Sequence, residues 1–326
     1  MRYPPGNTHE LALIESIRRA SASRPAGRVR VGIGDDCAVI RPPAGHEIVV
    51  TTDFCLEGRH FRRDWHTPES AGHRCLARGL SDLAAMGAKP IAAFLSLALP
   101  RDTDRRWVDG FFRGLRALAD AVSVPLAGGD TAASPGEHVL ADIVLMGSVP
   151  AGKALLRSTA KAGDLIYVTG SLGGAAAELK QLAAAPGKIR KSGEHPQLFP
   201  APRLSAGQTL LRRGLATSCI DVSDGLSTDL KHLCDASHLS AELVLPAASI
   251  HPLASGRIDL ALHGGEDYEL LFSAKPATRI PVTIEGVRIT RIGTFTARKP
   301  RAAITIIDES GHRRKLTAGG WEHRFG

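Results

Sequence analysis

Short acidic blocks that also contain glycine, serine or threonine recur along the chain. They are Gly34-Asp35-Asp36, Thr51-Thr52-Asp53, Ser81-Asp82, Gly128-Gly129-Asp130-Thr131, Asp221-Val222-Ser223-Asp224-Gly225 and Gly264-Gly265-Glu266-Asp267. Carboxylate and hydroxyl oxygens suit hard cations, and Mg²⁺ is typically held by one or two carboxylates together with the phosphates of a substrate. The blocks therefore predict a metal-dependent enzyme that acts on phosphate groups.

Each acidic block taken alone is also typical of a turn or a helix cap, because an aspartate side chain bonds nearby backbone N–H groups. Asp53, Asp130 and Asp221 each follow a β-rich or apolar stretch. This pattern predicts that the three carboxylates meet at strand ends, where α/β sheets bind ligands. Two carboxylates about 4 Å apart repel by roughly 4 kcal/mol at an effective dielectric of about 20, and bound cations would remove that cost.

Several other catalytic motifs are absent from the sequence. It contains no Walker loop, no set of protein-kinase motifs and no Gly-x-Ser-x-Gly nucleophile. Covalent catalysis is therefore disfavoured.

The elements that must position the acidic blocks alternate between strands and helices. In the first half we expect a strand over residues 48–53, a helix that starts at Thr67-Pro68-Glu69, a helix over about 103–121 and a strand over about 139–146. Arg78 and Asp82 are four residues apart on the first of these helices. They therefore share its polar face.

Turn formers at Pro150-Ala151-Gly152 predict two domains, residues 1–150 and 151–326. In the second half we expect strands over 165–168, 219–221 and 267–272, with helices after the first two. Residues 184–203 contain four prolines and predict a long exposed loop. The predicted fold class is α/β (α+β-like).

Composition limits the class of protein. The 326 residues are 43% hydrophobic, and the longest mostly apolar stretch, residues 90–100, is too short to span a bilayer. The N-terminus lacks a signal-peptide core. The five cysteines include no CxxC pair, which argues against a zinc site or a disulfide framework. We expect a cytoplasmic protein with no membrane partner.

The net charge of +8 raises the question of nucleic-acid binding. The basic residues are scattered, however, and aromatic residues make up only 5% of the chain, so base-stacking platforms are scarce. We expect no nucleic-acid partner.

The acidic blocks, taken in order, resemble the motifs of the thiamine-monophosphate kinase family, within the superfamily of aminoimidazole ribonucleotide synthetase and selenophosphate synthetase. The resemblance runs from about residue 10 to the C-terminus. The segments Ser81–Ala88 (Ser-Asp-Leu-Ala-Ala-Met-Gly-Ala) and Gly264–Leu270 (Gly-Gly-Glu-Asp-Tyr-Glu-Leu) are specific to these kinases. The chain departs from the family at Gly79, usually asparagine, and at Ala132-Ala133, usually Thr-Arg. Neither change touches a carboxylate.

The resemblance implies ATP-dependent phosphorylation of thiamine monophosphate to thiamine diphosphate by direct in-line transfer, with several Mg²⁺ ions and with ATP as co-substrate. The acceptor phosphate is already anionic near neutral pH, so no protein base is required. The main obstacle is repulsion between two polyanions. The resemblance also implies a homodimer, with an N-terminal dimerising domain that binds ATP and Mg²⁺ and a C-terminal α/β domain that closes over the active site.

The resemblance further assigns roles to residues. The metal-binding positions are Asp36, Thr51, Thr52, Asp53, Asp82, Asp130, Asp221 and Asp224. The ATP-binding positions are Gly129, Asp130, Arg157 and Ser223, and the substrate-binding positions are His60, Glu266 and Trp321. A guanidinium fork suits phosphate, an indole face suits the thiazolium cation, and a carboxylate can accept a hydrogen bond from the aminopyrimidine.

Three alternatives stay open at the level of sequence. The protein could be another ATP-dependent member of the superfamily, such as a purine-pathway synthetase or a hydrogenase-maturation factor, with a different substrate pocket. It could be a regulatory protein that binds ATP without consuming it, or a basic nucleic-acid binder whose affinity falls steeply with salt. In simpler interpretations, His60 is a surface residue and Trp321 packs against the core.

Overall fold

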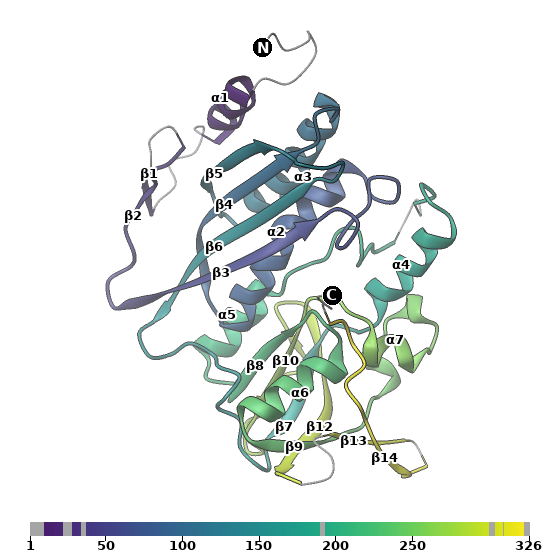
Figure 1. Cartoon of the computed structure of the whole chain (residues 1–326). Coiled ribbons are helices and arrows are strands. Elements are labelled where there is room, and N and C mark those ends of the chain that lie inside the picture. The colour runs from purple at the N-terminus through teal and green to yellow at the C-terminus, as the bar shows by residue number, and fades with distance from the viewer. Residues whose placement is uncertain are drawn as a thin grey trace. The chain divides into compact units, whose positions relative to one another are not determined.

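The computed structural model describes residues 10–21, 28–33, 37–189, 193–299, 304–308 and 310–322 (Figure 1). The chain divides into two compact units, and the division falls between Gly152 and Lys153. Two short segments group with the unit on the other side of this division: Ala84–Ala88 with the second unit and Pro186–Lys188 with the first. No helix in the described ranges is both long and apolar enough to cross a membrane.

The first unit is built on a four-stranded sheet in the order β3-β6-β4-β5. Its neighbouring strands are antiparallel except for the parallel pair β4 and β5. Helices α2 and α3 lie against one face of this sheet (Figure 1). The elements are α1 (Glu10–Ser21), β1 (Val29–Val31), β2 (Val39–Ile40), β3 (His46–Leu56), α2 (Pro68–Ala85), β4 (Lys89–Leu99), α3 (Arg105–Ala121), β5 (Leu126–Ala133) and β6 (Leu140–Pro150).

The predicted start of helix α2 is confirmed. Thr67 caps the helix, since its Oγ1 accepts a hydrogen bond from Ser70 N at 3.1 Å. Pro68 occupies the first turn, where no backbone N–H is needed. Leu76, Leu80 and Leu83 are buried, so the apolar stripe of the helix packs into the core of the unit.

The other face of the sheet carries exposed apolar side chains. Val50 and Phe54 on β3 are 62% and 61% exposed. They alternate with Thr51 and Asp53, so the two sets point to opposite faces of the strand. No helix in the described part of this unit covers this face (Figure 1). We call it the open sheet face; it carries Val50, Thr52, Phe54, Ser96, Asp130 and Asp142.

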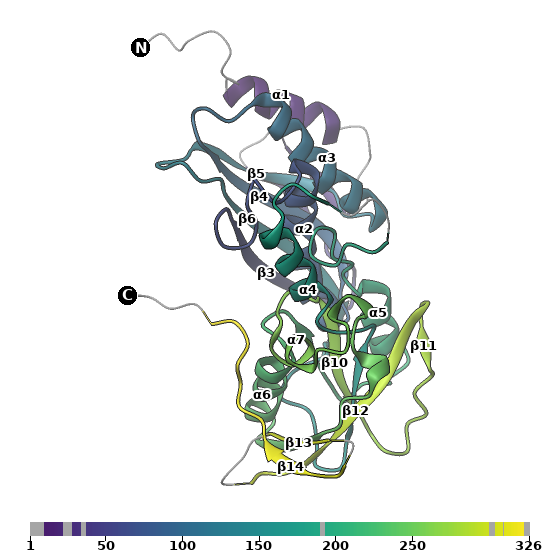
Figure 2. The same ribbon diagram turned by 90° about the vertical axis from the view of Figure 1, so that its right-hand side faces the viewer.

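The second unit contains an eight-stranded sheet in the order β14-β13-β9-β12-β7-β10-β8, with β11 paired to β12. Among its described strands only β13 and β9 run parallel. Figure 2 shows helix α6 against this sheet. The elements are β7 (Leu165–Thr169), α4 (Gly174–Ala184), α5 (Leu204–Arg212), β8 (Ser218–Val222), α6 (Leu226–Ala236), β9 (Leu239–Leu243), η1 (Ala247–Ser249), η2 (Pro252–Ala254), α7 (Ile258–His263), β10 (Glu269–Ala274), β11 (Thr283–Ile284), β12 (Val287–Ala297), β13 (Ile304–Ile307) and β14 (Arg313–Lys315).

Three expectations about these elements are wrong. The segment 184–203 is not exposed throughout, because Gln197 and Leu198 are 1% and 0% exposed. Strand β10 begins at Glu269 rather than at 267, since Glu266 and Tyr268 have positive φ angles of 66° and 51° that a strand does not accommodate. The third error concerns Asp53 and Asp130, which lie inside strands β3 and β5 rather than at their ends, whereas Asp221 is the penultimate residue of β8.

Candidate active site

Thr51, Asp53 and Asp82 lie between strand β3 and helix α2 in the first unit. Thr51 Oγ1 donates a hydrogen bond to Asp82 Oδ2 at 2.5 Å. Arg78 Nη2 donates to Asp53 Oδ1 at 2.9 Å and forms an ion pair with it. Arg78 and Asp82 therefore share one face of α2, as predicted, and this face meets β3. Asp36 lies outside the described residues.

Thr52 and Asp130 lie on the open sheet face. Four paired residues, one from each strand, lie side by side across this face: Phe54, Asp142, Ser96 and Asp130. Thr52 Oγ1 donates to Asp142 Oδ1 at 2.8 Å. Asp142 is absent from the predicted set. The sequence signal for it is an acidic residue inside the otherwise apolar stretch 139–146.

The sheet does not bring Asp53 and Asp130 together within one chain. Asp53 shares its register row with Ile143, Leu95 and Gly129. Three steps of about 4.8 Å between strands separate the two ends of that row by roughly 14 Å. The expectation that these two carboxylates meet at adjacent strand ends is therefore wrong for a single copy of the chain.

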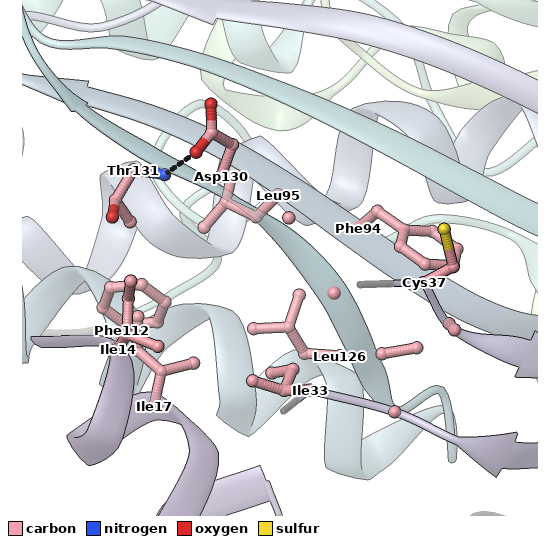
Figure 3. Close-up of a pocket in the computed structure, with 15 residues that line it drawn as sticks. Ile14, Ile17, Ile33, Cys37, Phe94, Leu95, Phe112, Leu126, Asp130 and Thr131 are labelled. Carbon is pink, nitrogen blue, oxygen red and sulfur yellow. Dashed lines mark hydrogen bonds between the residues drawn. The ribbon is translucent and has the colours of Figure 1, made fainter. Parts of the chain in front are cut away.

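A cavity of about 590 Å³ lies beside strand β5 in the first unit (Figure 3). Ile17, Phe112 and Leu126 contribute to its mainly apolar wall, and Asp130 lies at its polar side. Gly129 also lines it, with a φ of 144°, and a Cβ there would come within 1.9 Å of the Leu95 carbonyl oxygen. Only glycine fits at this point. The volume lies in the range of small-molecule sites.

His60 lies after the end of β3 and is buried, at 8% exposure. Leu56 N donates a hydrogen bond to its Nδ1 at 2.9 Å. Because Nδ1 accepts, the proton of the neutral ring is on Nε2, which is a donor. Arg74, itself fully buried, donates to the His60 carbonyl oxygen at 3.1 Å. His60 is therefore fixed in orientation and is not a surface residue.

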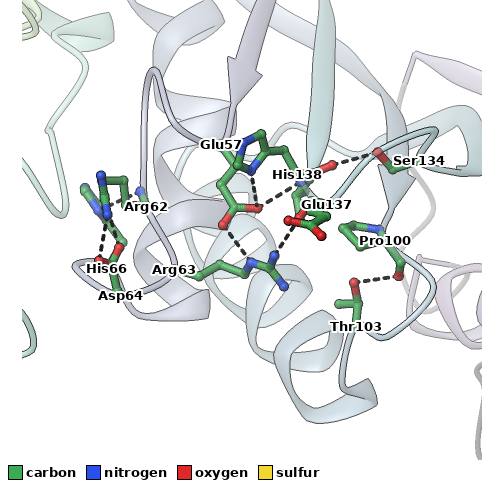
Figure 4. A network of polar contacts seen from close by, with 11 residues as sticks. Glu57, Arg62, Arg63, Asp64, His66, Pro100, Thr103, Ser134, Glu137 and His138 are labelled. Carbon is green, nitrogen blue, oxygen red and sulfur yellow. Dashed lines mark hydrogen bonds and ion pairs between the residues drawn. The ribbon is translucent and has the colours of Figure 1, made fainter.

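A polar network ties the His60 loop to the start of β6 (Figure 4). Glu57 accepts from Arg63 Nε at 2.7 Å and from Val139 N at 2.9 Å. Arg63 Nη2 also donates to the Glu137 carbonyl oxygen at 2.8 Å. The carboxylate of Glu57 therefore holds backbone in place, which restrains the loop that carries His60.

In the second unit, three loops are joined by backbone hydrogen bonds. Glu266 N donates to Ser223 O at 2.7 Å, and Trp321 N donates to Asp224 O at 2.9 Å. A Cβ at Gly320 would come within 2.1 Å of Asp224 O, so glycine permits the close approach. The structure thus brings Ser223, Asp224, Glu266 and Trp321 together. The Trp321 side chain is 49% exposed rather than packed in the core.

Acidic side chains cluster at the start of helix α6. Asp229 Oδ2 accepts from Asp224 N at 3.1 Å and from Gly225 N at 3.0 Å. Burial raises the pKa of the Asp229 carboxyl well above its usual range, and the nearby charges of Asp221 and Asp224 raise it further. A cation would relieve this repulsion.

The same cluster offers a ligand set for a metal ion. Three possible ligand atoms lie within 4.8 Å of one another, one from each of Asp224, Asp229 and His232. Two carboxylates and an imidazole suit a divalent cation. Asp229 and His232 are missing from the predicted set, and their only sequence signal is their spacing of three residues on one helix.

Arg157 is exposed and lies beside β8. Cys219 N donates to Leu156 O at 3.2 Å, and Ser237 Oγ donates to the Arg157 carbonyl oxygen at 2.8 Å. These bonds fix the main chain of Arg157 along the strand that carries Asp221.

Comparison with known proteins identifies the family. Residues 34–149 match the model of AIR synthase related protein, N-terminal domain, and residues 161–302 match that of its C-terminal domain. The thiamine-monophosphate kinase of Escherichia coli (strain K12) is 41% identical over 283 residues, which is 82% of this chain and 85% of that protein. The chain belongs to the thiamine-monophosphate kinase family.

Solved structures agree with this family and its fold. The thiamine-monophosphate kinase from Stenotrophomonas maltophilia K279a is 34% identical, with a TM-score of 0.78 over 92% of this chain and 97% of that one. The structure named AaThiL complexed with AMPPCP and TMP is 27% identical, with a TM-score of 0.74 over 99% of each chain. The fold is the mixed α/β two-domain fold of AIR synthase related proteins, as the resemblance implied.

Proposed function

We propose that the protein transfers a phosphoryl group from ATP to thiamine monophosphate, forming thiamine diphosphate. The observation that carries the proposal is the 41% identity to the thiamine-monophosphate kinase of Escherichia coli over 82% of this chain. The related structure named as a complex with AMPPCP and TMP supports both substrates. Membership of this family disfavours a nucleic-acid binder or another superfamily enzyme.

The cavity beside β5 is our candidate for the ATP base. Its apolar wall suits a flat heterocycle, while Gly129 lets backbone approach the ligand and Asp130 faces the polar side. Arg157 and Ser223 in the second unit stay our candidates for contacts to the phosphates, because a guanidinium fork matches phosphate oxygens. No covalent enzyme intermediate is involved in the proposed in-line transfer.

The acidic residues fit several Mg²⁺ ions rather than one. In the first unit Asp53 and Asp82, with the Thr51 hydroxyl, would hold metal, while Asp130 and Thr52 lie on the other face of the sheet. Asp221 and Asp224 would do so in the second unit, where Asp229 completes the cluster. When bound, Mg²⁺ neutralises charge on the transferring phosphates. Asp36 is retained as a proposed ligand from the family resemblance alone.

Three side chains are proposed to bind thiamine monophosphate. His60 is proposed to contact the substrate with a ring that is held in place by the hydrogen bond from Leu56 N to its Nδ1. Glu266 can accept a hydrogen bond from the amine of the pyrimidine, and the exposed face of Trp321 can stack on the thiazolium cation. None of these residues acts as an acid or base.

We also propose a homodimer formed through the open sheet face. Exposed apolar side chains such as Val50 and Phe54 mark interaction surfaces. Asp130 and Asp142 lie on the same face, so a partner subunit seated there would approach these carboxylates. Residues 1–150 would then bind ATP and dimerise, residues 151–326 would close over the site, and the cytoplasm is the proposed location.

A coupled ADP-release assay across three acceptors tests the proposed function. We expect ADP release with Mg²⁺, ATP and thiamine monophosphate, and none above background with thiamine or with aminoimidazole precursors. Turnover only with another acceptor would overturn the assignment. Binding of ATP without ADP release under all three conditions would instead indicate a regulatory protein.

A further inference from the structure

The turn at residues 195–199 is held against helix α4 by one buried carboxylate. Glu178 on α4 is 2% exposed and accepts from His195 Nδ1 at 2.6 Å and from Gln197 N at 2.9 Å. Phe199 N donates to His195 O at 2.7 Å and closes the turn. The position of Gln197 is therefore set by α4.

Helix α4 is itself anchored to the residue that follows Glu266. Asp267 Oδ2 accepts from Gly173 N at 2.6 Å, and Asp267 Oδ1 accepts from Ala175 N at 3.1 Å. Both donors lie at the N-terminus of α4, where backbone N–H groups lack partners within the helix. The start of α4 and the loop that carries Glu266 are thus fixed to each other.

From this anchored turn, the side chain of Gln197 contacts the carboxylate of Glu266. Its side chain is 1% exposed, and its Nε2 donates to Glu266 Oε2 at 2.9 Å. The backbone of Glu266 is held separately, because its N–H donates to Ser223 O and its φ angle is 66°. The Glu266 carboxylate is therefore oriented by a buried amide, while its main chain is fixed by another loop.

We infer that Gln197 is a positioning residue that orients the Glu266 carboxylate for the aminopyrimidine of the substrate; this inference rests on the proposed function. A lysine or arginine at this position would neutralise Glu266. An amide donates a hydrogen bond without adding charge, which suits a carboxylate that is to accept from the N–H donors of a cationic ligand. Gln197 thereby contributes to substrate specificity without touching the transferred phosphate.

Steady-state kinetics of Gln197→Met and Gln197→Ala test this inference. Methionine has a similar length and fills similar space without an N–H donor. We expect both variants to raise KM for thiamine monophosphate about tenfold, as loss of a hydrogen bond to a charged group predicts. The value of kcat and KM for ATP should change less than about twofold. Gln181→Ala, on the exposed side of helix α4, is the control and should leave all three constants unchanged.

A double-mutant cycle separates positioning from packing. In a Glu266→Gln background, Gln197→Met should change KM for thiamine monophosphate by less than about twofold, because the carboxylate that it orients is gone. An unchanged KM in Gln197→Met with Glu266 intact would overturn the inference, as would an equal KM change in both backgrounds. Glu178→Gln, which weakens the anchor of the turn, provides a second variant and should raise the same KM.

A substrate analogue with a hydroxyl in place of the pyrimidine amine adds a readout of specificity. The wild-type protein should favour the amine over this analogue, and Gln197→Met should reduce that preference. If the wild-type protein does not use thiamine monophosphate at all, the proposed function fails. If it does and Gln197→Met keeps wild-type KM and preference, only the role of Gln197 fails.

Discussion

The carboxylates proposed to bind metal differ in how their charge is balanced. Asp53 is paired with Arg78, and Asp82 accepts a hydrogen bond from a hydroxyl. Asp229 is buried beside Asp221 and Asp224, and its pKa is raised by burial and by both neighbours. A divalent cation bound there would relieve the repulsion between these three carboxylates.

Replacement of Asp130 by asparagine tests its role as a ligand. The carboxylate is exposed and bonds only its neighbour Thr131 N among the contacts described for it, so the free energy of unfolding should change by less than about 0.5 kcal/mol. Loss of a ligand should lower kcat/KM at least about 100-fold, since metal charge stabilisation is worth several kcal/mol. The measurement is turnover with thiamine monophosphate, alongside a urea melt. Asp102→Asn, at another exposed aspartate of this unit, should keep normal turnover. A near-normal rate in Asp130→Asn would show that the reaction does not need Asp130 as a metal ligand.

The buried Asp267 predicts a dependence of stability on pH. Burial raises the pKa of its carboxyl to about 7, although the N–H groups of Gly173 and Ala175 act in the opposite direction. The folded state therefore holds the proton more tightly than the unfolded chain does. The stability from this group is complete below about pH 4 and is lost as pH rises through about 7, up to about 4 kcal/mol in all.

Urea unfolding of the wild-type protein and Asp267→Asn from about pH 5 to about pH 8 measures this contribution. The free energy of unfolding of the wild-type protein should fall relative to that of the variant as pH rises. A difference between the two proteins that does not vary with pH would contradict the raised pKa of Asp267.

At the scale of elements, the two faces of strand β3 have different surroundings. One face meets helix α2 through Thr51 and Asp53, and the other presents Val50 and Phe54. A strand alternates its side chains, so one segment can supply both a metal ligand and a subunit interface. This arrangement links the proposed dimer to the proposed site.

Lysine at Val50 and Phe54 should disrupt the dimer, because two charges would be buried in an apolar interface. Light scattering during gel filtration should show a wild-type dimer and a monomeric double variant. Val282→Lys, at a residue that is 81% exposed in the second unit, is the matched control and should remain dimeric. A monomeric wild-type protein, or a double variant that stays dimeric, would exclude this face as the interface.

Elements with local signals could be predicted from the sequence. Helix α2 has its cap at Thr67 and an apolar stripe, and α6 buries Leu226, Leu230 and Leu233 as its spacing indicates. Strand β4 is an apolar run that could equally be a buried helix, so its type is not fixed locally. The start of β10 depends on left-handed backbone at Glu266 and Tyr268, which no propensity predicts for these residues.

At the scale of the whole molecule, the residues proposed to act in the site are distributed over two compact units. Thr51, Asp53, His60, Asp82 and Asp130 belong to the first unit. Those of the second are Arg157, Asp221, Ser223, Asp224, Glu266 and Trp321. The acidic blocks could be found from the sequence because each one contains a carboxylate and its small neighbouring residues within a short segment.

Residues that act through distant partners could not be found in this way. Asp142 meets Thr52 from 90 positions away, and Gln197 meets Glu266 from 69 positions away. Neither pair has a sequence spacing that a helical or strand pattern would reveal. The contact between Thr52 and Asp142 depends on strand register, and the contact between Gln197 and Glu266 depends on a turn that Glu178 holds.

The most direct measurement follows the γ-phosphoryl group of labelled ATP in a quenched reaction with thiamine monophosphate. With Mg²⁺ present, we expect label to enter thiamine diphosphate in a one-to-one ratio with ADP, and chelation of the metal should abolish the transfer. Label that appears only as inorganic phosphate, or thiamine diphosphate that forms at an undiminished rate after chelation, would contradict metal-assisted transfer between the two substrates.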